Sequence, residues 1–387
     1  MARTACPYCY AKVDGGRLWY QCTGRGSPGR PGCRPEVDPE RRDRTGFRDA
    51  ARPSFPPPGR LPIGSGKAPC PGCGAPSGIR VCPSCHTPVS STFGAAAGPL
   101  IALAGAKGTG KTVYLTVLAH ELLNGLRRRF GADVRMTATD PQAPLTGDIF
   151  TGRPLMFQTD QAIRGRRAPT VFEWRQEVRT RLRKGCRTTF LSFYDTAGED
   201  LSRDESAQDL LYLGAADALV LLLDPFMIPQ ARDRIRLPAQ ASRPEQPVIT
   251  VLNRVTENLR REHDVRPGRA IRIPVAVAFA KIDAFFDVLG PDHPLLRVPS
   301  AAGPYDETAG EQTHEEVRAL LHDWGADDVD AHLRHNYTTF RYFAVSALGT
   351  PPDYASNTVD PRGIRPFRVA EPLLWLLSRF DVVPRRR

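Results

Sequence analysis

The sequence lacks any apolar run long enough to cross a lipid bilayer, and its first residues lack the pattern of a secretory signal. We therefore expect a cytoplasmic protein with no membrane span. Lysine is also scarce, with six lysines among 53 basic residues, so arginine carries most of the formal net charge of +11 at pH 7. If eight cysteines bound two zinc ions, the net charge would fall to about +7. This modest excess is compatible with an anionic partner but does not require one.

Eight of the nine cysteines lie in the N-terminal region, and the missing export signal favours zinc sites over disulfide bonds. Taken in chain order, these cysteines predict two four-thiolate Zn²⁺ sites. The first would lie in a zinc ribbon over residues 1–34 and would use Cys6, Cys9, Cys22 and Cys33. The second would lie in a zinc ribbon over residues 67–92 and would use Cys70, Cys73, Cys82 and Cys85. The second pattern is the sharper one, because it consists of two C-x-x-C pairs.

Residues 35–66 separate the two predicted ribbons and are rich in proline, arginine and aspartate. They show no apolar periodicity, which predicts a flexible linker. Arginines in this region could follow the phosphates of a nucleic acid. Acidic residues interleave with these arginines, so a solvated linker is favoured over nucleic-acid binding. The ribbons themselves could bind a protein, bind nucleic acid or only present a rigid surface.

Residues 105–112 read G-A-K-G-T-G-K-T, a complete G-x-x-x-x-G-K-[ST] phosphate-binding pattern. The apolar run 99–104 predicts a buried parallel strand before it, and the apolar spacing of 113–123 predicts a helix that opens at Lys111. Backbone N–H groups of the loop and the helix N-terminus would hold phosphate oxygens. Lys111 would reach the β- and γ-phosphates, and the Thr112 hydroxyl would ligate Mg²⁺. The pattern therefore predicts that the chain binds a nucleoside triphosphate.

Two further motifs follow strand-like apolar runs. Asp195-Thr-Ala-Gly198 is a D-x-x-G pattern, in which Asp195 would hold Mg²⁺ through water and Gly198 would offer its N–H to the γ-phosphate. Lys281-Ile-Asp283 is a K-x-D pattern, in which the stem of Lys281 would lie over a purine ring. The Asp283 carboxylate could accept both N1–H and the exocyclic amine of guanine, donors that adenine does not offer together. The motif therefore favours GTP over ATP.

The region after the phosphate loop alternates strand-like and helical segments, which predicts an α/β fold. The runs 170–178 and 187–194 are expected to form a hairpin, and 140–169 shows no regular pattern. The other expected strands are 133–139, 218–224, 275–280 and 337–345, and the expected helices include 203–213, 248–261 and 371–378.

The order of these motifs, followed by Ser346-Ala347 after the last expected strand, resembles the G1, G3, G4 and G5 motifs of small GTPases of the TRAFAC class. The sequences FYDTAGED at 193–200 and RVAEPLLWLL at 368–377 resemble the bacterial double-GTPase family. Members of that family are associated with paired-GTPase, conflict-type gene systems. The resemblance implies a Ras-like P-loop GTPase domain over residues 96–384, with a mostly parallel six-stranded sheet and one antiparallel strand.

The resemblance also implies a role for each site residue toward bound GTP or GDP. The residues that would contact phosphates and Mg²⁺ are Gly105, Lys107, Gly108, Thr109, Gly110, Lys111 and Thr112. Asp195 and Gly198 would sense the γ-phosphate, and the guanine would be held by Lys281, Asp283, Ser346 and Ala347. Thr170 resembles the switch threonine of Arf-like GTPases, with Thr146, Thr151 and Thr159 as alternatives.

Three residues depart from the pattern of that class. Ala280 stands where an Asn or Thr usually braces the K-x-D loop, which implies weaker guanine affinity. Glu199 stands where many relatives carry a water-orienting Gln, and a carboxylate facing the γ-phosphate positions water poorly. Lys107 stands where a small residue is common, and its bulk could exclude a partner's arginine finger. We therefore predict slow GTP hydrolysis that depends on a protein partner, which could be a second GTPase.

Three functions remain open at this point. The leading interpretation is a regulatory GTPase that uses Mg²⁺ and recruits a partner through its zinc ribbons. One alternative is an ATP-using P-loop protein, which would have to tolerate adenine despite Asp283. The other is a zinc-ribbon adaptor for protein or nucleic acid, in which the nucleotide site only stabilises the fold.

Overall fold

The computed structural model describes residues 3–58, 66–89, 93, 99–106, 108–138, 169–179, 184–193, 207–235, 246–354, 356 and 358–386. Contacts divide the chain into two compact units. We call the first the cysteine unit, and it comprises Met1–Leu100, Met136–Asp140 and Ile163–Tyr194. We call the second the sheet unit, and it comprises Ile101–Arg135, Pro141–Ala162 and Asp195–Arg387.

A four-stranded parallel sheet forms the centre of the sheet unit. Its strands, in spatial order, are β10 (Ile101–Gly105), β14 (Ala218–Leu223), β15 (Val275–Phe279) and β17 (Phe340–Ala344). Every residue of β10, β14 and β15 is buried, as expected for central strands that are covered on both faces. Because the strands are parallel, their carboxyl ends lie at one edge of the sheet, which we call the sheet rim.

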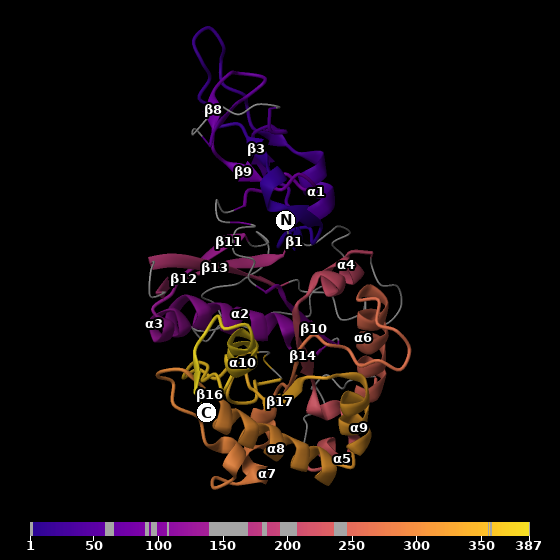
Figure 1. Ribbon diagram of the computed structural model, residues 1–387. Helices are drawn as coiled ribbons and strands as arrows, with labels where there is room; N and C mark the ends of the chain where they lie inside the picture. Colours follow the sequence, from indigo (N-terminus) through magenta and orange to yellow (C-terminus); the bar gives the residue numbers. More distant parts are fainter. Residues whose placement is uncertain are drawn as a thin grey trace. The chain divides into compact units, whose positions relative to one another are not determined.

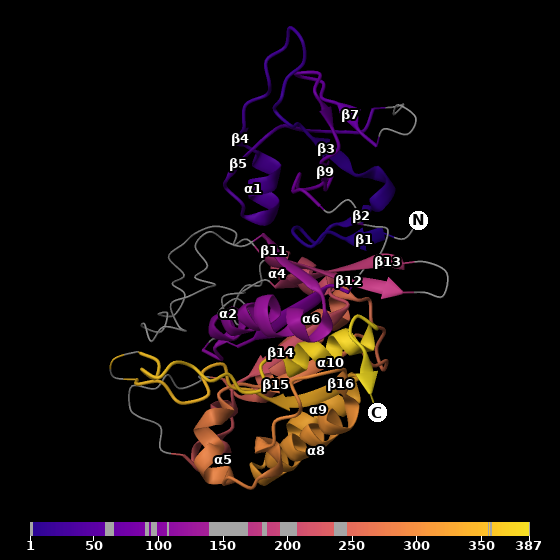
Figure 2. The ribbon, with the colours of Figure 1, turned by 90° about the vertical axis from the view of Figure 1, so that its left-hand side faces the viewer.

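Helices follow the strands of this sheet (Figures 1 and 2). Helix α10 (Glu371–Arg379) packs along β14 and β15, and α8 (Glu307–Asp323) lies against β17. Helix α6 (Val248–Glu262) contacts both α4 (Ala207–Ala215) and α9 (Asp327–Asn336). None of the helices in the described ranges combines the length and the hydropathy that a bilayer crossing requires.

Shorter elements complete the sheet unit. Helix α2 (Lys111–Glu121) continues through a π-helical turn, Leu122–Leu126, into α3 (Arg127–Phe130). The remaining short segments are Pro225–Met227, α5 (Pro229–Arg232), Ile282–Phe285, α7 (Phe286–Leu289), Pro294–Leu296, β16 (Tyr305–Asp306) and β18 (Arg385–Arg386). The strand–loop–helix order and the expected strands at 218–224, 275–280 and 337–345 are confirmed within a few residues.

The cysteine unit is built from short strands that reverse direction repeatedly. They are β1 (Arg3–Ala5), β2 (Lys12–Asp14), β3 (Trp19–Gln21), β4 (Glu36–Val37), β5 (Ala50–Ala51), β6 (Ser54–Phe55), β7 (Ala68–Pro69), β8 (Pro76–Ser77) and β9 (Arg80–Val81). Strand β3 lies between β6 and β9 and pairs antiparallel with both. The chain therefore returns twice to β3, which brings segments more than fifty residues apart into one small fold.

The segment predicted as a flexible linker contains a helix, α1 (Pro39–Thr45). Asp38 caps its first turn by accepting the Arg41 N–H at 3.0 Å, and Gly46 ends it with φ of 78°. Phe47 then enters the core with 5% of its surface exposed. The linker prediction is therefore wrong for residues 35–58, and a helix of this length is too short to show an apolar period. Residues 59–65 lie outside the described part of the chain.

The predicted hairpin is confirmed as β12 (Thr170–Arg179) and β13 (Lys184–Phe193), which pair antiparallel with Thr170 opposite Phe193. In the described residues these strands join β11 (Asp133–Ala138) in a separate three-stranded sheet and do not pair with β10. The six-stranded sheet that we predicted is thus divided into two sheets. The contacts also group the hairpin with the cysteine unit. Sequence alternation identifies a hairpin but does not say which strand it will pair with.

Candidate functional site

The phosphate-loop pattern forms the turn between β10 and α2 at the sheet rim. Gly108 and Gly110 both adopt positive φ, at 76° and 84°, which favours glycine at these two positions. A Cβ added at Gly105 would lie 2.6 Å from the carbonyl oxygen of Leu222 in the neighbouring strand. The glycines are therefore required by backbone shape and by close packing, and α2 opens at Lys111 as predicted.

Lys111 folds back over this loop. Its Nζ donates to the carbonyl oxygens of Gly105 at 2.7 Å and of Ala106 at 3.0 Å, and the side chain is buried. Thr109 Oγ1 donates to the same Ala106 carbonyl at 2.8 Å. Thr112 stands in the first turn of α2, while Lys107 lies outside the described residues. The loop thus places an ammonium group and a helix N-terminus together, an arrangement suited to anions.

Lys281 of the K-x-D motif reaches the phosphate loop. It follows β15 in a left-handed conformation, with φ of 56°. Its Nζ donates to the Gly108 carbonyl at 2.7 Å and to Asp224 Oδ2 at 2.6 Å. Asp224 follows β14 directly, is 1% exposed, and also accepts the Phe226 N–H at 2.9 Å. One ammonium group therefore ties the ends of two strands to the phosphate loop.

Asp283 and Ser346 also meet at the sheet rim. Burial raises the pKa of the Asp283 carboxyl, although a hydrogen bond with Ser346 and the charge of Lys281 act in the opposite direction. Ser346 follows β17 closely and its Oγ accepts the Gly349 N–H at 2.8 Å, with Ala347 next in the chain. The predicted guanine-reading residues are therefore brought together from the ends of β15 and β17.

Two residues at the sheet rim were missed by the sequence reasoning. Asp224 ends the run A-L-V-L-L-L-D, and an acidic residue directly after a buried strand could have marked it. Burial raises the pKa of the Tyr354 phenol, and the charges of Asp283 and Asp224 act in the same direction. No local pattern points to Tyr354, since it stands in an irregular segment after β17.

The predicted switch residues are only partly described. Thr170 is the first residue of β12 and is 4% exposed, in the cysteine unit. The other predicted residues of this kind lie outside the described residues: Thr146, Thr151, Thr159, Asp195, Gly198 and Glu199. Their roles therefore stay predictions.

The eight N-terminal cysteines form two clusters, but not the two that chain order predicts. We call the first the Cys6 site (Cys6, Cys9, Cys82 and Cys85) and the second the Cys22 site (Cys22, Cys33, Cys70 and Cys73). The grouping that we predicted is wrong, because β3 pairs with β9 and thereby returns the last cysteine pair to the first. The two ribbons are consequently interleaved and are not successive modules over 1–34 and 67–92.

Three of the four cysteine pairs share one backbone turn. In each C-P-x-C segment, the N–H of the residue after the second cysteine donates to the first cysteine's carbonyl, at 2.8 to 2.9 Å. That residue always has positive φ, and the three are Tyr10, Gly74 and His86. The fourth pair, Cys22 and Cys33, lacks the C-x-x-C spacing. The repeated turn presents two sulfur atoms on the same side of the chain, as a metal knuckle requires.

The sulfur separations fit a tetrahedral zinc ion. Cys6 and Cys85 Sγ are 3.8 Å apart, and Cys22 and Cys73 Sγ are 3.5 Å apart. Zinc–sulfur bonds of about 2.3 Å in a tetrahedron require sulfur atoms about 3.8 Å apart. All of these cysteines are free thiols. Each cluster could therefore hold one Zn²⁺.

The electrostatics of these clusters also call for a cation. Burial raises the pKa of the Cys6 thiol, whereas hydrogen bonds from Cys6 and Cys85 lower that of Cys82. In the other cluster, burial raises the pKa of Cys33 to about 12, and the Ala75 N–H lowers that of Cys73 to about 6. Four such close thiols cannot all lose their protons unless a cation balances the charge.

The fold and these sites define an α/β protein with a glycine-rich loop between the first strand and helix of its parallel sheet, and with two tetracysteine sites. No family model matches the chain. A Mycolicibacterium smegmatis protein named "Putative ESX-1 scaffolding and assembly protein SaeC" is 32% identical over 331 residues, which are 79% of this chain and 81% of that protein. The chain therefore belongs to the family of SaeC.

Among solved structures, the chain is similar to the S. cerevisiae Ski7 GTPase-like domain bound to GTP. The identity is 11%, the match covers 73% of this chain and 51% of that one, and the TM-score is 0.25. The chain thus spans about half the length of that structure, and a TM-score this low does not establish a shared fold.

Proposed function

We propose that this chain binds GTP with Mg²⁺ at the sheet rim, hydrolyses it slowly, and acts as a switch toward a protein partner. The observation that carries this proposal is the position of Lys281 Nζ, which bonds the Gly108 carbonyl of the phosphate loop and Asp224. This contact places the K-x-D motif beside the loop, which is where one nucleotide would need both groups.

The phosphate end of the proposed site rests on Lys111 and on the start of α2. Lys111 Nζ now bonds two loop carbonyls, and a triphosphate would offer oxygens of higher charge to the same group. The hydroxyl of Thr112 would ligate Mg²⁺, and Asp195 would do so through water. Bound Mg²⁺ would neutralise charge that develops on the phosphates. These residues would hold the triphosphate but would not by themselves orient the attacking water.

The base end of the proposed site rests on Asp283. As a carboxylate it would accept the two guanine donors, and its neighbour Ser346 would hold it in place. Ala280 cannot brace the K-x-D loop through its side chain, but the partly buried bond between Lys281 and Asp224 can. We therefore expect the loop to be firmer than its sequence alone predicts, so guanine selectivity survives the missing Asn or Thr.

The partner in this proposal is a protein. The related SaeC is named as a scaffolding and assembly protein, which favours protein contacts over nucleic acid. The interleaved tetracysteine fold would supply a rigid surface for such a partner. A second GTPase as partner is implied only by the resemblance to the double-GTPase family.

The same relationship favours a second candidate function. In that alternative, the chain is a scaffold whose nucleotide stabilises the fold and is never hydrolysed. Both candidates require binding at the sheet rim, and they differ in whether the bound nucleotide changes.

The test is nucleotide titration of the purified chain with Mg²⁺. We expect GTP and GDP to bind at least about a hundredfold more tightly than ATP, and Lys111→Ala to abolish binding. A matched control is Lys12→Ala, which removes a lysine from β2 in the cysteine unit. Equal affinity for ATP would overturn the proposal, and bound GTP that is never hydrolysed, even with partner present, would favour the scaffold.

A further inference from the structure

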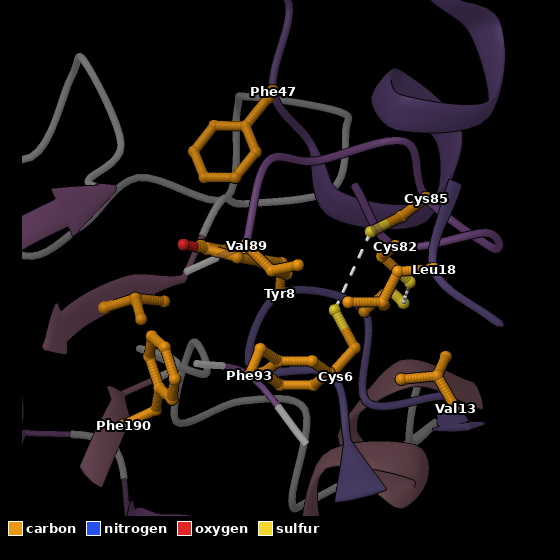
Figure 3. Close-up of a cluster of buried hydrophobic side chains, with 12 residues drawn as sticks. Cys6, Tyr8, Val13, Leu18, Phe47, Cys82, Cys85, Val89, Phe93 and Phe190 are labelled. Atoms are coloured by element: carbon orange, nitrogen blue, oxygen red, sulfur yellow. Dashed lines mark hydrogen bonds between the residues drawn. The ribbon is translucent and has the colours of Figure 1, made fainter. Parts of the chain in front are cut away.

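The two tetracysteine sites differ in what surrounds them. The buried cluster around the Cys6 site includes Val171 of β12. It also includes Phe190 of β13, which is labelled in Figure 3. The cluster around the Cys22 site consists of residues between Tyr20 and Ala75 and, within the described chain, includes none from the hairpin. Only the Cys6 site therefore shares a core with the β12–β13 hairpin in the part of the chain that the structure describes.

Polar bonds join the first cysteine knuckle to the hairpin. Ser192 of β13 is fully buried, and its Oγ donates to the Pro7 carbonyl, between Cys6 and Cys9, at 2.6 Å. The Tyr10 hydroxyl lies 3.4 Å from the same Oγ. On the knuckle side, these bonds use the Pro7 carbonyl and the Tyr10 hydroxyl, and the knuckle turn sets the positions of both groups.

A second set of contacts joins the knuckle to both neighbouring strands. The Tyr8 hydroxyl donates to Thr137 Oγ1 of β11 at 3.3 Å, and Thr137 in turn donates to the Val171 carbonyl at 3.2 Å. Tyr8 also packs edge-on against Phe47, with ring centres 6.3 Å apart. The knuckle therefore bonds β11 and β13 directly, and it is linked to β12 through Thr137 and the shared buried cluster.

In the sequence, the hairpin begins at one residue that the proposed switch would use and ends shortly before another. Strand β12 begins at Thr170, the predicted switch threonine, and β13 ends at Phe193, two residues before Asp195 in the sequence. Under the proposed function, a change in how the hairpin is held would therefore act on both of these predicted switch residues.

We propose that a metal ion in the Cys6 site holds the β12–β13 hairpin and thereby sets nucleotide affinity, whereas a metal ion in the Cys22 site does not. The proposal rests on the proposed function for its nucleotide half. Its physical basis is that a tetracysteine knuckle keeps its turn only while a metal ion binds its thiolates. Loss of the metal would release Pro7, Tyr8 and Tyr10 from their partners on the sheet. By reciprocity, bound GTP would raise the affinity of the Cys6 site alone for its metal ion.

The test compares two matched double variants of the full-length chain. Cys82→Ser/Cys85→Ser empties the Cys6 site, and Cys70→Ser/Cys73→Ser empties the Cys22 site. Both remove one C-P-x-C pair, so each should reduce bound zinc from two ions to one per chain, measured by elemental analysis. Hydrogen exchange of β12 and β13 is then measured without nucleotide, and GDP dissociation is measured separately.

We expect the Cys6-site variant to speed exchange in the hairpin and GDP release by about tenfold or more, and the Cys22-site variant to change each by less than about twofold. A third variant, Tyr10→Phe with Ser192→Ala, keeps all eight cysteines and should speed hairpin exchange while both zinc ions stay bound. If the cysteine variants fail to fold, this variant still tests the proposal, and unchanged hairpin exchange in it would contradict the proposed role of the Cys6 site.

The outcomes separate the two proposals. Unchanged hairpin exchange in the Cys6-site variant, or equal effects of both cysteine variants, would overturn the proposed role of the Cys6 site. A wild-type chain that binds no guanine nucleotide would instead overturn the proposed function, whatever the hairpin does.

Discussion

The bond between Lys281 and Asp224 allows an asymmetric prediction about stability. The Asp224 side chain is 1% exposed and that of Lys281 is 31% exposed, with 2.6 Å between the bonded atoms. Lys281→Met would leave a buried carboxylate with the Phe226 N–H as the remaining bond that the structure assigns to it. Asp224→Asn would instead leave an ammonium group that water can reach and that still bonds the Gly108 carbonyl.

The expected magnitudes follow from this difference in burial. Removing one partner of a buried pair costs about 3–5 kcal/mol, and we expect Lys281→Met to lie in this range. Asp224→Asn keeps an acceptor for Phe226 and exposes the cation to solvent, so we expect a cost of about 1–2 kcal/mol. The double variant should cost less than the sum of the two, by about 1–3 kcal/mol, because neither charge is then left alone.

Native-state hydrogen exchange of β14 and β15 is the suitable assay, because it reports the opening free energy of this unit separately from the cysteine unit. Trp375 in α10 provides a second probe of the same core, since it is buried against the sheet unit's interior. Equal costs for the two single variants, or strict additivity in the double variant, would refute the claim that Lys281 stabilises the buried carboxylate of Asp224.

Two further predictions concern the sheet unit. Burial lowers the pKa of His314, whose Nδ1 accepts the Tyr342 N–H at 3.0 Å. Below about pH 6.5 the imidazole of His314 therefore binds a proton more readily in the unfolded chain than in the folded one, so the free energy of unfolding should fall as the pH drops through the lowered pKa. His314→Gln should reduce this loss of stability, measured by denaturation at pH 7.5 and at pH 5. Gly105→Ala should destabilise β10 by about 1–3 kcal/mol in hydrogen exchange, because its Cβ would meet the Leu222 carbonyl. A cost indistinguishable from zero would contradict this packing argument.

The sequence predicts the strand, loop and helix around Lys111 well, because these features depend on short local patterns. Apolar runs identify β10, β14 and β15, and the glycines mark the backbone shape of the turn between β10 and α2. The approach of Asp283 to Ser346 could also be predicted, because carboxyl ends of parallel strands share an edge.

The grouping of the cysteines could not be predicted in the same way. The three C-P-x-C pairs are equivalent as local patterns, and four cysteine pairs can combine into two sites in more than one way. The choice depends on β3 pairing with both β6 and β9, which are contacts between distant short strands. Two-residue strands leave almost no periodic signal, so only the folded chain shows which pairs meet.

The packing of the hairpin against the Cys6 site could not be predicted for a similar reason. Val171 and Phe190 read as ordinary inward-facing strand residues, and alternation does not name the surface that they cover. The pairing of Asp224 with Lys281 could not be predicted, because the two residues lie 57 positions apart in the sequence. In each case the deciding contact joins residues far apart in the chain.

The most direct test of the account replaces the hydrogen-bonding pattern of Asp283 and leaves its size nearly unchanged. The carboxylate accepts N1–H and the exocyclic amine of guanine, whereas the amide of an Asn would accept N1–H and donate to the carbonyl that xanthine carries in place of the amine. We predict that the wild-type chain prefers GTP over xanthosine triphosphate by about a hundredfold or more, and that Asp283→Asn reverses this preference. The same preference in both proteins would contradict the claim that Asp283 reads the base at the sheet rim.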